Sequence, residues 1–286
     1  MFLGKCKALL ERVTRSLVRL GLYPMSLHSD PDEIAVAERA FFDQVAGKRL
    51  DSAKQPISKK NLERYRLATN APYFMKEKMF DIVNKFPGKK LLEIGCGEGD
   101  SSVQLAYTGK EVVAYDLSPV SIEVAKRQAQ ANNVSIDFRV GDATDCELLK
   151  GETFDIVWCQ LVLHHLVNSF ENVMQSVYDS LRPGGLFVSC EPIAYNRILK
   201  KFSHFAPNRE FTPDECPLRP SEFEIIRKYF PHLETRYYRL FGRSNLFTQN
   251  LTIIKMTAML DNLLFLMPGM KGFAGNVVMW ATKNNL

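Results

Sequence analysis

Residues 91–100 read Leu-Leu-Glu-Ile-Gly-Cys-Gly-Glu-Gly-Asp, and this stretch decides the fold. An apolar run passes through the acidic Glu93 into three alternating glycines, and the run Asp100-Ser101-Ser102 then offers side chains that cap helices. The pattern predicts a strand, a tight turn and a helix N-terminus. Glycines lack a Cβ and tolerate positive φ, so the backbone can approach a ligand closely beside the N–H groups of the helix end.

This glycine loop departs from the dinucleotide-binding pattern in two ways. A G-x-G-x-x-G fingerprint that starts at Gly95 and Gly97 needs a third glycine at position 100, where Asp100 stands. Glu93 precedes the first glycine by two residues, and a carboxylate there suits an ammonium group and repels a pyrophosphate. Both features disfavour a nicotinamide oxidoreductase.

The composition excludes several classes of protein. The chain has 286 residues, 46% of them hydrophobic and 24% charged, with a mild net charge of +5. No long basic block appears, so nucleic acid is not an expected partner. Six scattered cysteines without a C-x-x-C pair favour reduced thiols. Neither a signal peptide nor a run of about 18 apolar residues stands out, so we expect a cytoplasmic protein without a transmembrane segment.

Strand and helix patterns alternate after the glycine loop, which predicts a parallel sheet with helices on both faces and ligands beyond the carboxyl ends of its strands. The later strands are expected at residues 111–116, 136–140, 154–159, 186–190, 234–241 and 276–282. The helices are expected at residues 119–131, 170–181, 221–229 (capped by Ser221) and 251–267.

Acidic residues follow the second and third expected strands. Asp116 can accept hydrogen bonds from both ribose hydroxyls of a nucleoside, and Asp142 can accept one from an adenine amino group beside the small Ala143. A lone Asp after a strand is usually a turn residue. The two together, in register with the glycine loop, favour cofactor binding.

Five pieces between residues 85 and 192 resemble the class I S-adenosyl-L-methionine (SAM)-dependent methyltransferases, in the branch that acts on small molecules. The pieces are LLEIGCGEGD (91–100), VVAYDLS (112–118), VGDA (140–143), FDIVWCQLVLHHL (154–166) and LRPGG (181–185). The resemblance implies a Rossmann-like α/β fold with a mostly parallel sheet of seven strands, helices on both faces, and a last antiparallel hairpin.

The same resemblance implies SAM as the cofactor, with the glycine loop at its methionine moiety and the end of the fourth strand near its sulfonium. The cofactor-binding residues that it implies are Glu93, Gly95, Cys96, Gly97, Gly99, Asp116, Leu117, Asp142, Ala143, Cys159 and Gln160. No metal site is expected.

Three side chains are candidates for a general base at the acceptor. His164 and His165 follow the fourth strand, and neutral imidazole takes a proton near pH 7. Glu191 ends the fifth strand and can bind a cationic acceptor or act as a base. Each has a plainer interpretation, since the histidines can pack or bond to the backbone, and local N–H groups can hold the carboxylate.

Residues 1–75 are expected to form a helical cap before a methyltransferase domain at 76–286, in which residues 195–220 and 245–273 are cap insertions. We expect these segments to close over the carboxyl edge of the sheet. Tyr65 and Arg66 are candidates for the cofactor, and Tyr73 and Tyr195 for the acceptor, although aromatic residues at such spacing are more often core residues. The basic amphipathic stretch 5–20 is expected to pack on its own domain, with a peripheral membrane contact as the alternative.

These patterns predict a SAM-dependent methyltransferase that acts on a small-molecule acceptor, as a monomer or a homodimer. The apolar end segments suggest a hydrophobic acceptor. Protein or nucleic-acid methylation is disfavoured, because Cys159-Gln160-Leu161-Val162 stands where an N/D-P-P-Y/F tetrad would follow the fourth strand. The alternative is a non-catalytic member of the fold that serves as a partner subunit or a binding module.

Overall fold

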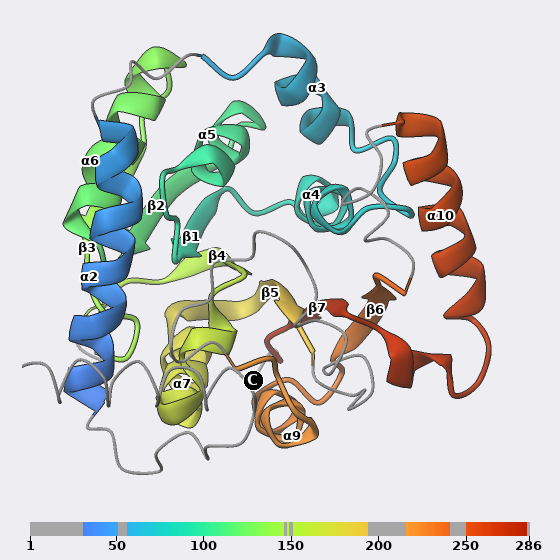
Figure 1. The fold of residues 1–286 in the computed structure, drawn as a ribbon. Helices are drawn as coiled ribbons and strands as arrows, with labels where there is room; N and C mark the ends of the chain where they lie inside the picture. The colour runs from blue at the N-terminus through green and yellow to red at the C-terminus, as the bar shows by residue number, and fades with distance from the viewer. Residues whose placement is uncertain are drawn as a thin grey trace, which may run out of the picture.

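The computed structural model describes residues 31–50, 56–145, 148, 151–193, 216–240 and 250–284, and it contains one sheet with the strand order β3-β2-β1-β4-β5-β7-β6 (Figure 1). The strands are β1 (Lys90–Ile94), β2 (Glu111–Asp116), β3 (Asp137–Val140), β4 (Phe154–Gln160), β5 (Leu181–Pro192), β6 (Glu234–Tyr238) and β7 (Asn276–Thr282). β1 to β5 are parallel, whereas β7 runs antiparallel to both β5 and β6. This confirms the predicted fold.

Helices cover both faces of the sheet and separate the core into two clusters. The described helices are α2 (Pro31–Leu50), α3 (Lys59–Leu67), α4 (Met75–Lys85), α5 (Asp100–Tyr107), α6 (Pro119–Ala131), α7 (Phe170–Ser180), α9 (Pro220–Tyr229) and α10 (Leu251–Leu264). Short 3-10 turns are η1 (Leu163–His165), η2 (Val167–Ser169) and η4 (Met270–Phe273). α4 and α5 lie on one side of the sheet, and α7 and α9 on the other (Figure 1). Buried side chains of α4, α5 and α6 fill one cluster, and those of α7 and α9 fill the other.

Local signals set several element boundaries, and three differences from the prediction have a visible physical cause; β3, β4, α7, β6 and α10 also begin or end one to three residues away from their expected bounds. α6 begins as expected, because the Ser118 hydroxyl accepts from the Ser121 N–H and Pro119 is the first helical residue. α5 has Gly99 as its N-cap, so Asp100 is the first residue of the helix instead of its cap. α9 begins at Pro220 with Arg219 as its cap, whose N–H donates to the Glu222 carboxylate at 2.7 Å, so the prediction of Ser221 as the cap is wrong.

The third difference is the start of β5, which begins at Leu181 and not at Leu186. Two backbone hydrogen bonds with Lys283 support this earlier start. The Gly184 N–H donates to the Lys283 carbonyl at 3.0 Å, and the Lys283 N–H donates to the Gly185 carbonyl at 2.8 Å. The Arg-Pro-Gly-Gly sequence therefore ends α7 and also forms the first part of β5.

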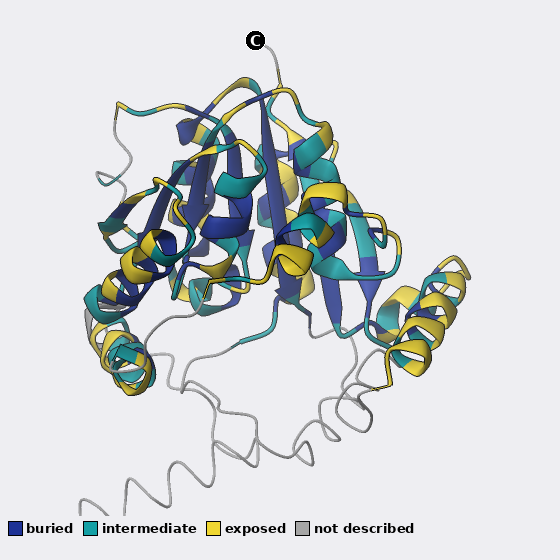
Figure 2. Ribbon diagram, turned by 90° about the horizontal axis from the view of Figure 1, so that it is seen from above, coloured by how far each residue is buried: buried dark blue, intermediate teal, exposed yellow. Residues whose placement is uncertain are grey.

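Helices α2 and α10 both lie at the carboxyl edge of the parallel strands. β6 runs in the direction of β1 to β5, because β7 is antiparallel to both of its neighbours. The connection from β6 to β7, which contains α10, must therefore lie at that edge. Figure 2 shows α2 and α10 at the two ends of this side, opposite the C-terminus. No helix among the described residues is long and apolar enough to span a membrane.

Candidate active site

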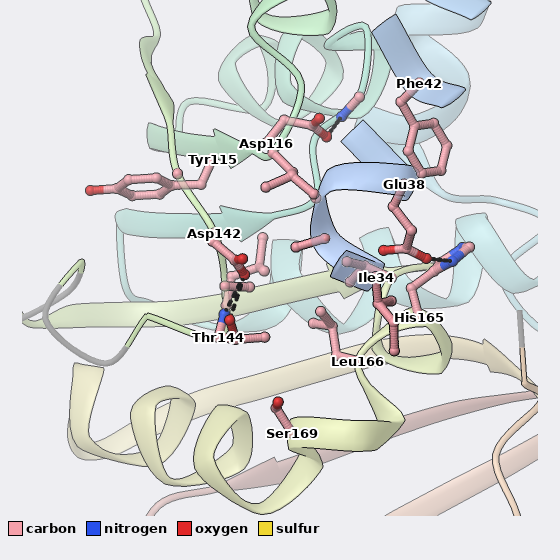
Figure 3. A pocket seen from close by; sticks show the side chains of 18 of the residues that line it. Ile34, Glu38, Phe42, Tyr115, Asp116, Asp142, Thr144, His165, Leu166 and Ser169 are labelled. Atoms are coloured by element: carbon pink, nitrogen blue, oxygen red, sulfur yellow. Dashed lines mark hydrogen bonds and ion pairs between the residues drawn. The ribbon is translucent and has the colours of Figure 1, made fainter. Parts of the chain in front are cut away.

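Two cavities meet at the glycine loop on the carboxyl edge. The first cavity, of about 290 Å³, is enclosed by this loop, the ends of β2 and β3, the turn after β4 and helix α2 (Figure 3). The second cavity, of about 340 Å³, lies on the other side of the loop against the start of α5. Phe42, Gly95 and Gly97 line both cavities, so the two form one site around the loop.

The three loop glycines differ in what surrounds them, although each has a positive φ, of 70°, 52° and 82° in chain order. A Cβ on Gly95 would lie 2.5 Å from a methyl of Val162, and a Cβ on Gly99 would lie 2.8 Å from the Cβ of Ala125. A Cβ on Gly97 would meet nothing within 4 Å. The packing of the protein itself therefore requires Gly95 and Gly99, whereas Gly97 leaves open space that a ligand can fill.

Asp116 and Asp142 both line the first cavity, as the sequence predicts, together with Leu117 and Ala143. The Asp116 carboxylate accepts from the N–H groups of Gly97 at 2.7 Å and Ser118 at 2.9 Å, and burial raises its pKa. The Asp142 carboxylate also fulfils the turn role of a lone aspartate, because it accepts from the N–H and the hydroxyl of the residue two positions on.

Glu93 brings a buried carboxylate to the second cavity, which Cys96 and Gln160 also line. The Ser102 hydroxyl donates to Glu93 at 2.5 Å. Burial raises the pKa of Glu93 to about 7, against the opposing effects of this hydrogen bond and of the Lys76 ammonium. The carboxyl group is thus ready to ionise when a cationic group arrives beside it.

The two histidines after β4 have different surroundings. His164 is buried, and its Nδ1 lies 2.8 Å from the carboxylate of the fully buried Glu191. The other oxygen of Glu191 accepts from the N–H groups of Val162 at 3.2 Å and Leu163 at 3.0 Å. Local N–H groups thus hold the Glu191 carboxylate, as in the plainer interpretation of this residue, and the pair stabilises the turn after β4. Neither His164 nor Glu191 lines either cavity.

His165 lies on the wall of the first cavity, and its Nδ1 is 2.9 Å from the carboxylate of Glu38. Glu38 comes from α2 and is only 5% exposed, and Figure 3 shows the two side chains facing each other at the cavity. The ring of Phe42 meets the imidazole edge-on at 5.8 Å. The sequence analysis does not identify Glu38, because no local signal links it to a histidine 127 residues away.

Three contacts hold α2 across the site. The Ser118 hydroxyl donates to Asp43 at 2.5 Å, next to the end of β2. Arg49 donates to Glu98 of the glycine loop at 2.8 Å, and Arg127 of α6 donates to the last carbonyl of α2 at 2.8 Å. Together with the Glu38–His165 contact, they place α2 over both cavities.

Other candidates from the sequence do not line the two cavities. Among the described residues, Gly99 packs against α6 and Cys159 is buried inside β4. Tyr65 packs on Phe80 with ring centres 4.8 Å apart, and Arg66 pairs with Glu63 at the surface. Tyr73 lies in the turn between α3 and α4. Tyr195 is outside the described residues, within which no group of three His, Cys, Asp or Glu side chains could hold a metal ion.

The strand order, the glycine loop after β1 and the carboxylates after β2 and β3 define the class I SAM-dependent methyltransferase fold. Residues 92–189 match the family model of the methyltransferase domain, and the cofactor of this class of methyltransferase is SAM. The open space at Gly97, the buried carboxylate of Glu93 and the half-buried carboxylate of Asp116 fit a ligand that carries an ammonium group and a ribose.

Curated relatives match about half of the chain. The chain is 33% identical over 149 residues to a ubiquinone biosynthesis O-methyltransferase of Actinobacillus pleuropneumoniae, over 49% of this chain and 60% of the relative. It is 38% identical over 118 residues to the mitochondrial ubiquinone biosynthesis O-methyltransferase of Schizosaccharomyces pombe, over 40% and 42% of the two chains. The match thus spans about half the length of these relatives.

A solved structure shows the same fold over most of the chain. This is the magnesium protoporphyrin IX methyltransferase from Synechocystis PCC 6803, with bound SAH, at a TM-score of 0.52 and 16% identity. The similarity covers 88% of this chain and all of that one. At this level of identity, it supports the fold alone.

Proposed function

We propose that this protein transfers a methyl group from SAM to a hydroxyl group of a small acceptor, with His165 as the general base and Glu38 as the residue that orients it. One observation carries the proposal: the His165 imidazole shares a cavity with Gly97 and Asp116 while a buried carboxylate contacts its Nδ1. The O-methyltransferase names of the relatives support an oxygen acceptor.

The Glu38 carboxylate determines how His165 can act. A hydrogen on Nδ1 that is donated to Glu38 leaves the lone pair on Nε2, and this nitrogen can take the proton of an acceptor hydroxyl. The carboxylate also stabilises the imidazolium that forms. The bound cofactor supplies a methyl group that its sulfonium has already activated, so the remaining task of the chain is to align the acceptor oxygen with it.

The two cavities have separate tasks in this proposal. Asp116 accepts from the ribose hydroxyls and Asp142 from the adenine amino group, both at the first cavity, whereas Glu93 pairs with the amino group of the methionine moiety at the second. Helix α2 limits the access of water to the reacting atoms. Ile34, Leu161 and Leu166 add an apolar wall to the first cavity, which supports an acceptor with an apolar part.

The test is methyl transfer from labelled SAM to phenols, catechols and aliphatic alcohols, with SAM binding measured separately by calorimetry. We expect His165→Gln to retain SAM affinity and to lower kcat by about 100-fold or more, the usual contribution of a general base. The control is His232→Gln, at an exposed histidine after α9. An unchanged kcat in His165→Gln would exclude the base, and a wild-type protein that does not bind SAM would exclude the whole proposal.

A further inference from the structure

Helix α10 and the segment that follows it carry large apolar side chains on their outer surface. Met256 is 65% exposed, Leu263 is 64% exposed, and Leu266 is 81% exposed. Nine of the thirteen exposed large apolar side chains among the described residues belong to this part of the chain. They are Leu251, Ile253, Met256, Met259, Leu260, Leu263, Leu266, Met267 and Phe273, and we call them the outer apolar surface.

The inner side of α10 makes polar contacts beside Ala258 and the buried Phe265, whereas most of its large apolar side chains lie on the outside, which is the reverse of the usual surface arrangement. Only Ala258 and Asp261 of the helix are fully buried. The Asp261 carboxylate accepts from the Leu240 N–H at 3.1 Å. The Asn262 side-chain oxygen accepts from Arg236 of the edge strand β6 at 2.6 Å and 3.1 Å. Polar contacts thus hold the helix in an orientation that exposes its leucines and methionines.

The exposed charged side chains of α10 and η4 are both lysines. Between residues 241 and 286 the sequence has one acidic residue, Asp261, and this residue is buried. Lys255 on α10 and Lys271 on η4 are both exposed. A second copy of the same surface would bring lysines against lysines without carboxylates to pair them. An anionic lipid surface provides both an apolar layer and the opposite charge.

We propose that α10 and η4 dock this protein on an anionic phospholipid membrane. The apolar side chains enter the boundary between headgroups and acyl chains, and the two lysines contact lipid phosphates. Because α10 lies at the carboxyl edge of the sheet, the docked membrane borders the edge that holds both cavities (Figure 2). The docking does not depend on methyl transfer and can be tested without it.

The test is co-sedimentation of the full chain with vesicles of phosphatidylcholine and phosphatidylglycerol, or of phosphatidylcholine alone. We expect tighter binding to the anionic vesicles by roughly tenfold or more, since each lysine near such a surface contributes about fivefold. The double variant Met256→Glu/Leu263→Glu should lose about 100-fold in binding, and Lys255→Glu roughly tenfold. The matched control is Leu67→Glu on α3, where the leucine is 60% exposed, and it should bind like the wild type.

Three outcomes would overturn the proposal. Full binding by the folded double variant would place the membrane contact elsewhere in the chain. Equal binding to neutral and anionic vesicles would remove the role of the lysines. A wild-type dimer that the double variant converts to a monomer, without vesicle binding by either, would assign the outer apolar surface to self-association. Thermal melts check that each variant folds, which we expect because both replaced side chains are exposed.

Discussion

Helices α2 and α10 lie at the same edge of the sheet and direct their apolar side chains in opposite ways. α2 turns the Phe42 ring toward the two cavities and leaves charged residues such as Arg39 exposed. α10 turns the Asn262 amide inward and exposes Leu263. The apolar side of α2 completes a site within the protein, whereas the apolar side of α10 faces outward.

The difference shows that apolar content alone does not tell which side of a helix faces the core. In α2, polar contacts of Asp43 and Arg49 hold the helix over the site, and the buried carboxylate of Glu38 reaches a histidine of the site. In α10, hydrogen bonds of Asp261 and Asn262 hold the helix. Variants near α2 therefore test catalysis and cofactor binding, whereas variants of α10 test which side of that helix faces the protein.

The largest effect is expected at the glycine loop that α2 covers. Gly97→Arg should abolish SAM binding in calorimetry, with a loss of about 1,000-fold or more, because the new side chain fills the space where the two cavities meet. The matched control is Gly109→Arg, since Gly109 also has a positive φ and nothing within 4 Å of its Cβ position but lies in the turn after α5. Equal SAM affinity in the two variants would contradict this assignment.

The next effect concerns the contact from α2 to the turn after β4. Glu38→Gln should lower kcat by about 100-fold while SAM affinity changes little, because an amide cannot stabilise the imidazolium of His165. The pH–rate profile separates this role from simple packing: without the carboxylate the imidazolium loses its proton more easily, so the variant should reach its lower maximal rate at a lower pH than the wild type. The control is Asp43→Asn, which alters another contact of α2 without touching His165. A parallel loss of activity in both variants would indicate that only the position of α2 matters.

These residues also show how far the sequence predicts the structure. The bounds of β2, α6 and β7 agree with the prediction, because their signals are local, such as the Ser118 cap. The early start of β5 depends on the pairing of Leu181 with Phe154 of β4 and on backbone bonds to Lys283, which no local pattern reveals. The cap of α9 depends on a hydrogen bond between Arg219 and Glu222 in place of the expected serine.

The candidate site follows the same division. The glycine loop, Asp116 and Asp142 are predicted, because a strand end followed by glycine or aspartate is visible in the sequence. The sequence cannot separate His164 from His165, since both follow the same strand and only the fold buries one of them against Glu191. A tertiary contact over 127 residues brings Glu38 to the site, so sequence patterns cannot identify it.

A smaller effect is expected from Glu93 at the second cavity. Its carboxyl group has a pKa of about 7 in the free protein, and an ammonium group beside it lowers that pKa. Binding therefore releases a proton between about pH 5 and 7, so the affinity for S-adenosylhomocysteine should rise about tenfold across this window. Glu93→Gln should flatten this dependence in calorimetry, whereas Glu98→Gln, at a loop residue on the same cavity, should retain it.

The pH dependence of the free energy of unfolding tests the raised pKa of Glu93 without any ligand. The folded-state pKa of Glu93 lies above the ordinary value of 4.5, so its contribution to stability is complete below pH 4.5 and is lost as the pH rises through about 7. Glu93→Gln should therefore raise the free energy of unfolding more at about pH 8 than at about pH 5. A variant that is equally stabilised at both values would contradict the raised pKa.

The smallest effect sharpens the comparison within α10 itself, at two adjacent residues. Asn262→Ala should lower the free energy of unfolding by about 1–2 kcal/mol, because it removes the acceptor of two hydrogen bonds from the Arg236 guanidinium. Leu263→Ala should change it by no more than about 0.5 kcal/mol, because the leucine is 64% exposed. Alanine favours a helix at both positions, so helix propensity does not explain a difference in this direction. If α10 packed its apolar side on the core, Leu263→Ala would lower the free energy of unfolding more than Asn262→Ala. Chemical denaturation that gives this order would show that α10 buries Leu263 in solution.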